Sequence, residues 1–511
     1  MYITKGFDIM YELVLILPAV ALIFSVFTDV LLMSYLQLII STLVFLTVVA
    51  ISLSFHAISV FFGGLFFVDY INLVILITVS TLELFVAFYS FGYVRTEIKH
   101  GLSKRKFKFY YFWKNLFIFS MMVSIMSNNL GIYWTGLEAT TLATALLVSF
   151  NRTKESFEAT WKYVIMCSVG IAIGLFAIVI LYFTTSQVYG ESLKSLSFIN
   201  IMRAGSELDR NFLMLAFILA LVGFGTKVGF APMHNWLPDA HSQGPSPVSA
   251  LLSGVLLNTA LLGILRFYQI NGAAGIYYPR YFLIGFGFFT ILVSAFSIIK
   301  QTDYKRLFAF SSMENMGLIA LGFGIGGIAV IASLFQILFH ALNKGALFLS
   351  SGNVLAVTHE RKIEKIRNLS KNFPITGLML LFGVMGISGM PPFAMFLGEI
   401  YIMFGVFKTN IWFGFLVFLL LIFIFAGLFS KILKMYIGVK DGENGQQNEN
   451  RADSGTDKDN RDRGEIGVHP FMLYAPLILL LISSILLFYI PSPFLHIVKS
   501  ASAEFGGKII F

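Results

Sequence analysis

Charged residues are scarce in this chain of 511 residues. Asp, Glu, Lys and Arg together make up 12% of it, whereas hydrophobic residues make up 57%. So little polar surface cannot coat a soluble globule, and apolar runs of about 20 residues, the length that crosses a bilayer, recur throughout. The composition excludes a soluble protein and predicts a polytopic membrane protein with one membrane domain.

Cysteine is almost absent, since Cys167 is the only one. An intramolecular disulfide, a cysteine-bound cluster and a structural zinc site are therefore excluded. The chain also has no P-loop lysine motif and no sign of paired axial histidines for haem. We expect no cofactor here, and we expect electrons or nucleotides to act through partner subunits.

The apolar runs predict an all-α fold with about 14 transmembrane helices. No A-x-A-like site follows the first run, and Asp8 and Glu12 precede or begin it, so we expect a membrane span there instead of a cleaved signal peptide. The predicted spans are 11–27, 31–52, 66–92, 116–128, 131–149, 162–183, 211–231, 248–270, 281–299, 306–323, 327–355, 375–407, 411–435 and 470–490.

Lysine and arginine gather on alternate connections between these spans. Five connections hold 25 of the 36 Lys and Arg residues: 93–115, 150–162, 300–306, 359–371 and 431–469. The positive-inside rule makes this set cytoplasmic and, with an even number of spans, places both termini outside the cell membrane. The basic stretch 104–108 is then a topology signal and not a nucleic-acid site, because no soluble domain is predicted to present it.

The chain divides into five predicted parts. They are 1–115 with the first three helices and a basic cytoplasmic loop, 116–270 and 281–435 as two inverted five-helix repeats, 436–469 as a flexible cytoplasmic loop, and 470–511 with the last helix. Segment 440–467 has no apolar periodicity and mixes both charge signs, which is typical of a solvated tether.

Six charged residues lie within or at the edge of the apolar runs: Glu83, Glu138, Lys227, Glu314, Lys344 and Glu399, with His340 one helical turn before Lys344. Each costs free energy in the bilayer core, so intramembrane charges usually mark a function. A buried ion pair that only joins helices explains one such residue, but several in one chain favour ion translocation.

Two spans carry glycine and proline beside their charges. In 223–239, Pro232 follows Gly229; in 383–399, Pro391 and Pro392 follow Gly389. Proline interrupts the helical hydrogen bonds, so we expect helices 7 and 12 to be broken near mid-membrane. Broken helices five spans apart, an odd number, are typical of inverted repeats, with the ion path along the repeat interface.

At this point the sequence resembles a known family. The stretch KVGFAPMHNWLPDAHSQGPSPVSA at 227–250 is similar to the signature of the proton-translocating family shared by Mrp-type cation/proton antiporters and antiporter-like subunits of respiratory complex I. Similarity extends over about 66–435, and LEATTLATALLV, WKYVIMCSVGIAIGL and SSMENMG look most like component F of hydrogenase 4 and related subunits of energy-converting membrane-bound hydrogenases. The lateral C-terminal helix of the largest complex I relative is not expected.

The resemblance implies fourteen helices with helices 7 and 12 broken, and it implies roles for single residues. Glu138 matches a helix-5 glutamate that pairs with the helix-7 lysine, here Lys227. Lys344 matches the central lysine of helix 11, and Glu399 the acidic form of the helix-12 terminal site. Expected partners are antiporter-like and hydrogenase or complex I-like membrane subunits.

Helix 8 departs from the family pattern. Where relatives often carry a lysine or histidine, the matching positions are Ser253 and Asn258. Neither side chain titrates, so a proton moving from Lys227 to Lys344 has to cross water that these groups hold.

The predicted mechanism is an electrostatic gate. Opposite charges about 4 Å apart attract by about 4 kcal/mol at an effective dielectric of about 20, so moving Glu138 decides whether Lys227 keeps its proton. The proton then passes through Lys344 to Glu399. His340 is a further relay candidate, and His234 and His241 are candidates for a cytoplasmic uptake path, although each histidine is equally able to bond exposed backbone beside a break.

Two other functions fit the same residues. A self-sufficient or Mrp-type Na⁺/H⁺ antiporter could use Glu83, Glu138 and Glu399 in a sodium site. A quinone-binding or architectural subunit of an oxidoreductase predicts instead that neutralising Lys344 or Glu399 leaves ion transport intact.

Overall fold

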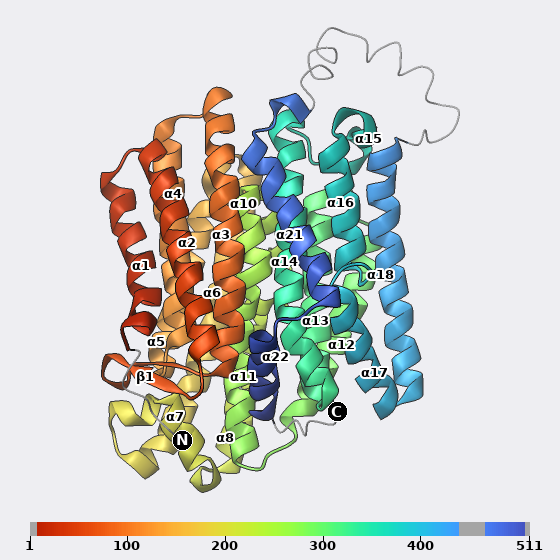
Figure 1. Cartoon of the computed structure of the whole chain (residues 1–511). Coiled ribbons are helices and arrows are strands. Elements are labelled where there is room, and N and C mark those ends of the chain that lie inside the picture. The colour runs from red at the N-terminus through yellow and green to blue at the C-terminus, as the bar shows by residue number, and fades with distance from the viewer. Residues whose placement is uncertain (1–7, 439–464, 506–511) are drawn as a thin grey trace.

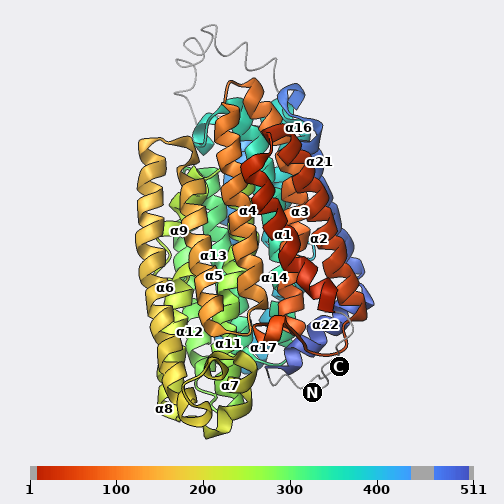
Figure 2. The same ribbon diagram turned by 90° about the vertical axis from the view of Figure 1, so that its left-hand side faces the viewer.

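A computed structural model of the chain describes residues 8–438 and 465–505. Long helices run side by side through most of the molecule (Figures 1 and 2). The helices of this bundle are α1 (Asp8–Phe27), α2 (Val30–Ser54), α3 (Tyr70–Lys99), α4 (Lys104–Met126), α5 (Leu130–Val148), α6 (Lys154–Tyr189), α8 (Arg210–Val228), α10 (Ser246–Leu251), α11 (Leu257–Ala273), α12 (Pro279–Ile299), α13 (Tyr304–Ile325), α14 (Ile328–Thr358), α16 (Pro374–Ile387), α17 (Met395–Thr409), α18 (Ile411–Ile437) and α21 (Pro470–Phe488).

Within the described residues, 11 helices are long and apolar enough to cross a membrane. Three more candidates complete the predicted set of about fourteen. They are α4, α5 and the pair α16 and α17, taken as two parts of one interrupted span. The fold is that of an all-α polytopic membrane protein, while the number of spans stays a prediction.

The first basic connection is much shorter than expected. Instead of a loop over 93–115, α3 continues to Lys99 and α4 begins at Lys104, so only 100–103 join them. Lysine and arginine are good helix formers, and their long side chains extend a helix beyond the apolar layer. The basic residues therefore mark helix ends here.

Short elements cover the two ends of the bundle. The hairpin β1 (Ser59–Phe61) and β2 (Phe66–Val68), α7 (Phe198–Ala204) and α22 (Ser492–Ala503) lie at one end, and α15 (Leu369–Asn372) lies at the other (Figure 1). The hairpin occupies the start of the predicted third span, which therefore begins at Tyr70. We call the end that carries 100–103, 300–303 and α15 the basic end.

Two helices are interrupted where the sequence predicts. α8 ends at Val228, Gly229 follows at φ 87°, and the short helix α9 (Trp236–Gln243) begins after a turn. α16 ends at Ile387, Gly389 follows at φ 63°, and α17 resumes at Met395. Each turn contains a cis X-Pro bond, at Pro232 and Pro392. These matching breaks fit two related halves, and the inverted repeat itself stays a prediction.

The predicted loop 440–467 lies mostly outside the described residues. Its last three residues form the short turn η7 (Glu465–Gly467). There the Glu465 carboxylate accepts from the backbone N–H groups of Ile375 (3.1 Å) and Thr376 (2.6 Å), which satisfies donors in the first turn of α16.

Candidate functional site

Most of the predicted intramembrane charges are enclosed by the bundle. Glu83, Lys227, Glu314 and Lys344 are each at most 4% exposed. Glu138 and Glu399 are partly buried. Because an unpaired charge is costly in such surroundings, the partners of each side chain indicate what it can do.

Lys227 lies in the last turn of α8 and contacts α5. Its Nζ donates to the Leu137 carbonyl and to Thr141 Oγ1, both at 2.6 Å. Thr141 Oγ1 in turn donates to Glu138 Oε2 at 3.2 Å, and Ser168 Oγ donates to Glu138 Oε1 at 3.1 Å. Lys227 and Glu138 thus do not form a direct ion pair in this structure, since one hydroxyl joins them.

Glycines hold α8 against α6 at the level of Lys227. A Cβ on Gly223 would lie 2.4 Å from the Gly174 backbone nitrogen, and a Cβ on Gly170 would lie 2.6 Å from Thr226 Cβ. The two backbones touch as in small-xxx-small packing. This contact fixes the Lys227 turn relative to α6, which carries Ser168.

Lys344, in α14, is bound in the same manner by α13. Its Nζ donates to the Phe308 carbonyl at 2.6 Å and makes a short bond to Ser311 Oγ. Each central lysine therefore donates to one backbone carbonyl and one hydroxyl of a neighbouring helix. Neither lysine has a carboxylate among these hydrogen-bond partners.

Serine side chains connect the predicted eighth span, which the structure divides into α10, η5 and α11, to α13. Ser253 lies in the π-helical turn η5 (Leu252–Leu256) between α10 and α11, and its Oγ is 2.6 Å from Ser312 Oγ. Ser312 Oγ also bonds at 3.2 Å to the Phe308 carbonyl, which accepts from Lys344 as well. The two serines thus end on the carbonyl that also accepts from Lys344, without a direct hydrogen bond to the lysine. Ser312 could not be singled out from the sequence. Asn258 bonds back to Gly254 at 2.7 Å, and its Oδ1 is buried without a described partner.

Amide side chains continue from Glu314 toward the second break. Asn315 Nδ2 donates to Glu314 Oε2 at 2.7 Å, and Gln336 Nε2 donates to Asn315 Oδ1 at 2.9 Å. Gln336 packs on Gly398, where an added Cβ would lie 1.9 Å from its Oε1. The adjacent residue is Glu399.

Glu399 folds back onto the break itself. An added Cβ on Gly389 would lie 2.0 Å from Glu399 Oε2, so the carboxyl group occupies the space that this glycine leaves open. Its Oε1 is buried and has no hydrogen-bond partner among the described residues.

Two of the three histidines predicted to take part in the path are enclosed by the bundle. His241 and His340 are fully buried with both ring nitrogens unpartnered within the described residues, and His241 stacks on Phe348 at 4.9 Å. His234 is partly buried. A polar pocket of about 560 Å³ lies near α9, lined in part by Asp239 and Asp303.

Several polar residues in or beside this pocket were not predicted. Asp239 pairs with Lys162 at 3.0 Å and with Arg306 at 2.7 Å. Lys305 is fully buried and donates to the Gly244 carbonyl at 2.7 Å. They were missed because lysine and arginine near helix ends look like ordinary topology signals.

Glu83 hydrogen-bonds to residues of α2 and α4 and not to the central lysines. Its Oε1 accepts from Gln37 in α2 at 2.9 Å and from Lys114 in α4 at 3.2 Å. Lys114 is fully buried, although it falls in the stretch expected to be a basic loop.

The comparisons identify the family. A family model described as NADH:quinone oxidoreductase/Mrp antiporter, transmembrane, matches residues 127–425, more than half of the chain. The chain belongs to this family. The family resemblance inferred from the sequence is confirmed.

Two curated relatives illustrate the range of the family. The chain is 38% identical over 356 residues to the hydrogenase-4 component F homolog of Methylacidiphilum infernorum, covering 68% of this chain and 74% of that protein. It is 32% identical over 329 residues to NADH-quinone oxidoreductase subunit L of Escherichia coli, covering 63% of this chain and 50% of that protein. The second match spans about half of that relative's length.

Solved structures share the fold over nearly the whole chain. A chain of the archaeal membrane-bound sulfane sulfur reductase matches with a TM-score of 0.78 and 20% identity, covering 99% of this chain and 98% of that one. A chain of the Mrp complex of Dietzia sp. matches with a TM-score of 0.78 and 18% identity, covering 98% and 97%. At such identities the likeness concerns the fold alone.

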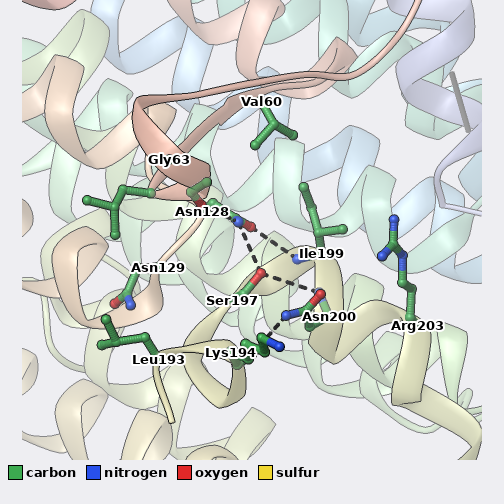
Figure 3. A pocket seen from close by; sticks show the side chains of 12 residues that line it. Val60, Gly63, Asn128, Asn129, Leu193, Lys194, Ser197, Ile199, Asn200 and Arg203 are labelled. Atoms are coloured by element: carbon green, nitrogen blue, oxygen red, sulfur yellow. Dashed lines mark hydrogen bonds between the residues drawn. The ribbon is translucent and has the colours of Figure 1, made fainter. Parts of the chain in front are cut away.

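A second pocket, of about 320 Å³, lies at the end opposite the basic end (Figure 3). Asn128 organises it, because its Nδ2 donates to the Gly64 carbonyl (2.7 Å) and to Ser197 Oγ (3.0 Å). Lys194 and Arg203 also line it. None of the predicted site residues does, so this pocket is not part of the central chain.

Proposed function

We propose that this chain is a proton-translocating membrane subunit of a multisubunit redox complex, such as an energy-converting hydrogenase. Protons cross it through Lys227, Lys344 and Glu399. The observation that carries the proposal is the matched setting of two buried lysines, each held by a carbonyl and a hydroxyl of a neighbouring helix. A lysine without a bonded carboxylate holds its proton less firmly in an apolar interior, which suits a relay.

Thr141 is the coupling element of the proposed gate. Its hydroxyl accepts from Lys227 and donates to Glu138, so it transmits the position of one charge to the other. When Glu138 withdraws, Lys227 loses stabilisation and releases its proton. Moving one charge against 100 mV requires about 2.3 kcal/mol, within the range of such a change in pairing.

Beyond the gate, the proton path continues through Ser253, on the predicted eighth span, and Ser312, on α13. A serine hydroxyl both donates and accepts, so a pair of them passes a proton without titrating. The π-helical turn that carries Ser253 supports this role, since such turns are frequent at functional sites. Between Lys344 and Glu399 the proton crosses water held by Asn258, His340 and the amides of Asn315 and Gln336 beside Glu314. Glu399 then delivers it to the far side.

Uptake occurs at the basic end, which the positive-inside rule makes cytoplasmic, with both termini outside the cell membrane. The polar pocket beside α9 supports this, because its charges lie next to the break that carries His234 and His241. The energy comes from partner subunits. The names hydrogenase-4 component F homolog and formate hydrogenlyase subunit 3 among the relatives support a hydrogen-producing or formate-oxidising complex.

The direct test is proton pumping by the reconstituted complex. Pumping should stop in Lys227→Ala and Glu138→Gln while the redox reaction continues uncoupled. Wild-type pumping in either variant contradicts the gate.

A second candidate function is Na⁺/H⁺ antiport. It is supported by 29% identity over 354 residues to a component of the Na⁺/H⁺ antiporter of Alkalihalophilus pseudofirmus, a match that spans 42% of that protein. The purified chain in proteoliposomes separates the two functions. Sodium uptake driven by a pH gradient without partners favours the antiporter.

Replacing Thr141 with valine should lower pumping by about tenfold, the effect of about 1.4 kcal/mol of lost coupling. Valine keeps the volume but neither accepts from Lys227 nor donates to Glu138. Thr140→Val is the matched control, because this neighbouring threonine is equally buried and bonds only to its own helix at Leu137. Equal pumping in the two variants contradicts the hydroxyl relay.

Ser253→Ala should slow proton transfer by several-fold while leaving assembly unchanged, since it removes one hydroxyl from the bridge to Lys344. Ser253→Thr, which restores the hydroxyl, should recover most of the rate. Ser351→Ala serves as a control, because Ser351 is also fully buried and bonds back to Phe348 one turn away. Stopped-flow recording of internal pH in proteoliposomes measures the rate.

A further inference from the structure

A cavity of about 750 Å³ lies at the basic end of the bundle, where α4 begins, α5 ends and α6 begins. Three cationic side chains line it: Arg105 and Lys106 from the first turn of α4, and Arg152 from the turn that joins α5 to α6. Among the described residues, no Asp or Glu lines this cavity. Its positive charge is therefore not neutralised by acids of the chain itself.

Other cations at the basic end are paired with acids. Asp239 binds both Lys162 (3.0 Å) and Arg306 (2.7 Å). The acids at the start of α6, Glu155 and Glu158, line the polar pocket beside α9 and not this cavity. Within 8–438 and 465–505, the three cations of the cavity make no side-chain hydrogen bond or ion pair. A topology signal requires only that such charges lie at this end, whereas here they converge on one space.

The backbone of Arg152 is strained where it enters the cavity wall. Its φ is 54°, in the left-handed region that glycine adopts without a steric penalty. The N–H of Arg152 donates to the Ser149 carbonyl at 2.9 Å, which closes the turn after α5. Glycine would form this turn with less strain, but it has no side chain to carry a charge. Strained residues of this kind often belong to binding sites.

The cavity also has apolar walls, formed in part by Leu146 of α5 and Phe157 of α6. One helical turn deeper into the bundle, on the same helix faces, lie Leu142, which is 56% exposed, and Trp161, which is 66% exposed. Tryptophan is typical of the boundary between lipid headgroups and tails. Exposed apolar surface thus continues from the three cations into the layer that lipid tails occupy.

We propose that this cavity binds the headgroup of one anionic phospholipid, of which phosphatidylglycerol is the simplest, with its acyl chains along α5 and α6. The phosphate oxygens accept hydrogen bonds from the guanidinium and ammonium groups. Basic pockets between transmembrane helices on the cytoplasmic side suit such headgroups. A free phosphate ion would use the cations alone, whereas a lipid also covers the apolar walls. The site is separate from the Lys227, Lys344 and Glu399 path.

Lipid binding to the whole chain, titrated with phosphatidylglycerol and measured by native mass spectrometry, tests this site. Replacing Arg105→Gln and Lys106→Gln together should weaken binding by about tenfold or more, because two charges beside the headgroup are lost. Lys104→Gln with Lys108→Gln is the matched control. It removes the same charge from the same exposed stretch, but neither lysine lines the cavity. The control should bind as the wild type does, and equal affinity in the two double variants overturns the proposal.

Ligand chemistry separates a lipid from a free anion. Zwitterionic phosphatidylcholine should bind the wild type and the Arg105→Gln, Lys106→Gln variant equally. Glycerol phosphate, which has the phosphate group without acyl chains, should fail to displace phosphatidylglycerol at equal concentration. If it displaces the lipid, the cavity is a site for free anions and the proposal fails.

The assembled complex shows whether a lipid or a protein occupies the cavity. A photoreactive benzophenone side chain introduced at Phe157 should attach to a phospholipid, which adds the mass of one lipid to this chain. The same group introduced at Phe415, an exposed phenylalanine of α18, is the control for attachment to bulk lipid and should show no preference for phosphatidylglycerol. Attachment of Phe157 to a partner subunit, or to both lipid classes equally, overturns the proposal.

Discussion

Replacing Lys344 with methionine is expected to abolish proton translocation by the assembled complex, with a loss of at least about tenfold, while the protein still folds. Methionine fills a similar volume but carries no proton, so the chain is cut between Ser253 and Glu399. Folding should survive because Lys344 makes no direct ion pair, and Glu314, the buried carboxyl group that interacts with it, keeps its hydrogen bond from Asn315. Proton uptake and redox turnover, measured in the same proteoliposomes, report the two effects separately.

An arginine at this position separates charge from proton release. Lys344→Arg keeps the positive charge, but a guanidinium does not deprotonate in proteins, so pumping should stay lost. If Lys344→Arg pumps normally, the lysine acts only as a fixed charge and the relay is wrong. Lys408→Met, at an exposed lysine in the last turn of α17, is the control and should pump normally.

Replacing Gly389 with alanine is the second change with a large expected effect. The new Cβ would lie 2.0 Å from Glu399 Oε2, so the carboxyl group has to leave the second break. Pumping should fall by about tenfold or more, as expected when about 1.4 kcal/mol of positioning is lost at a relay group. Proton pumping by the variant complex measures the effect.

The backbone strain of this substitution has a matched control. Gly389 is at φ 63°, and a non-glycine residue in this region costs about 1–2 kcal/mol. Gly326 is at φ 86° but has open space around its added Cβ, so Gly326→Ala carries strain without a clash. Both variants should unfold at a lower temperature, and only Gly389→Ala should lose pumping. Equal pumping in the two contradicts the role given to Glu399.

The sequence predicted the broken helices well because their cause is local. Glycine at positive φ followed by proline interrupts a helix wherever the two occur, so the breaks after Val228 and Ile387 could be located without tertiary information. The ends of α3 and α4 were predicted poorly, because hydropathy marks where the apolar layer ends and not where the helix ends. The hairpin at 59–68 has no signal of its own, since phenylalanine and valine suit a span as well as a strand.

Site residues divide along the same line. Glu138, Lys227, Lys344 and Glu399 stand out because each is a charge within an apolar run. Lys114 did not, since it ends a run of basic and aromatic residues that reads as a loop. The hydroxyls and amides that link the charges, such as Thr141, Ser312 and Gln336, resemble many other polar residues of the spans, and only contact with another helix distinguishes them.

The sequence alone determined that this chain is an all-α membrane protein of the antiporter-like family. Hydropathy, helix-breaking residues and the family motif are all local properties of the linear sequence. Only the tertiary structure decided which groups meet. It places a threonine between Glu138 and Lys227, Ser312 of α13 beside Ser253, and a lysine beside Glu83. The physical reason is that a helix fixes the direction of its own side chains, whereas the partner of each buried charge comes from another helix and depends on how closely small residues let the two backbones approach.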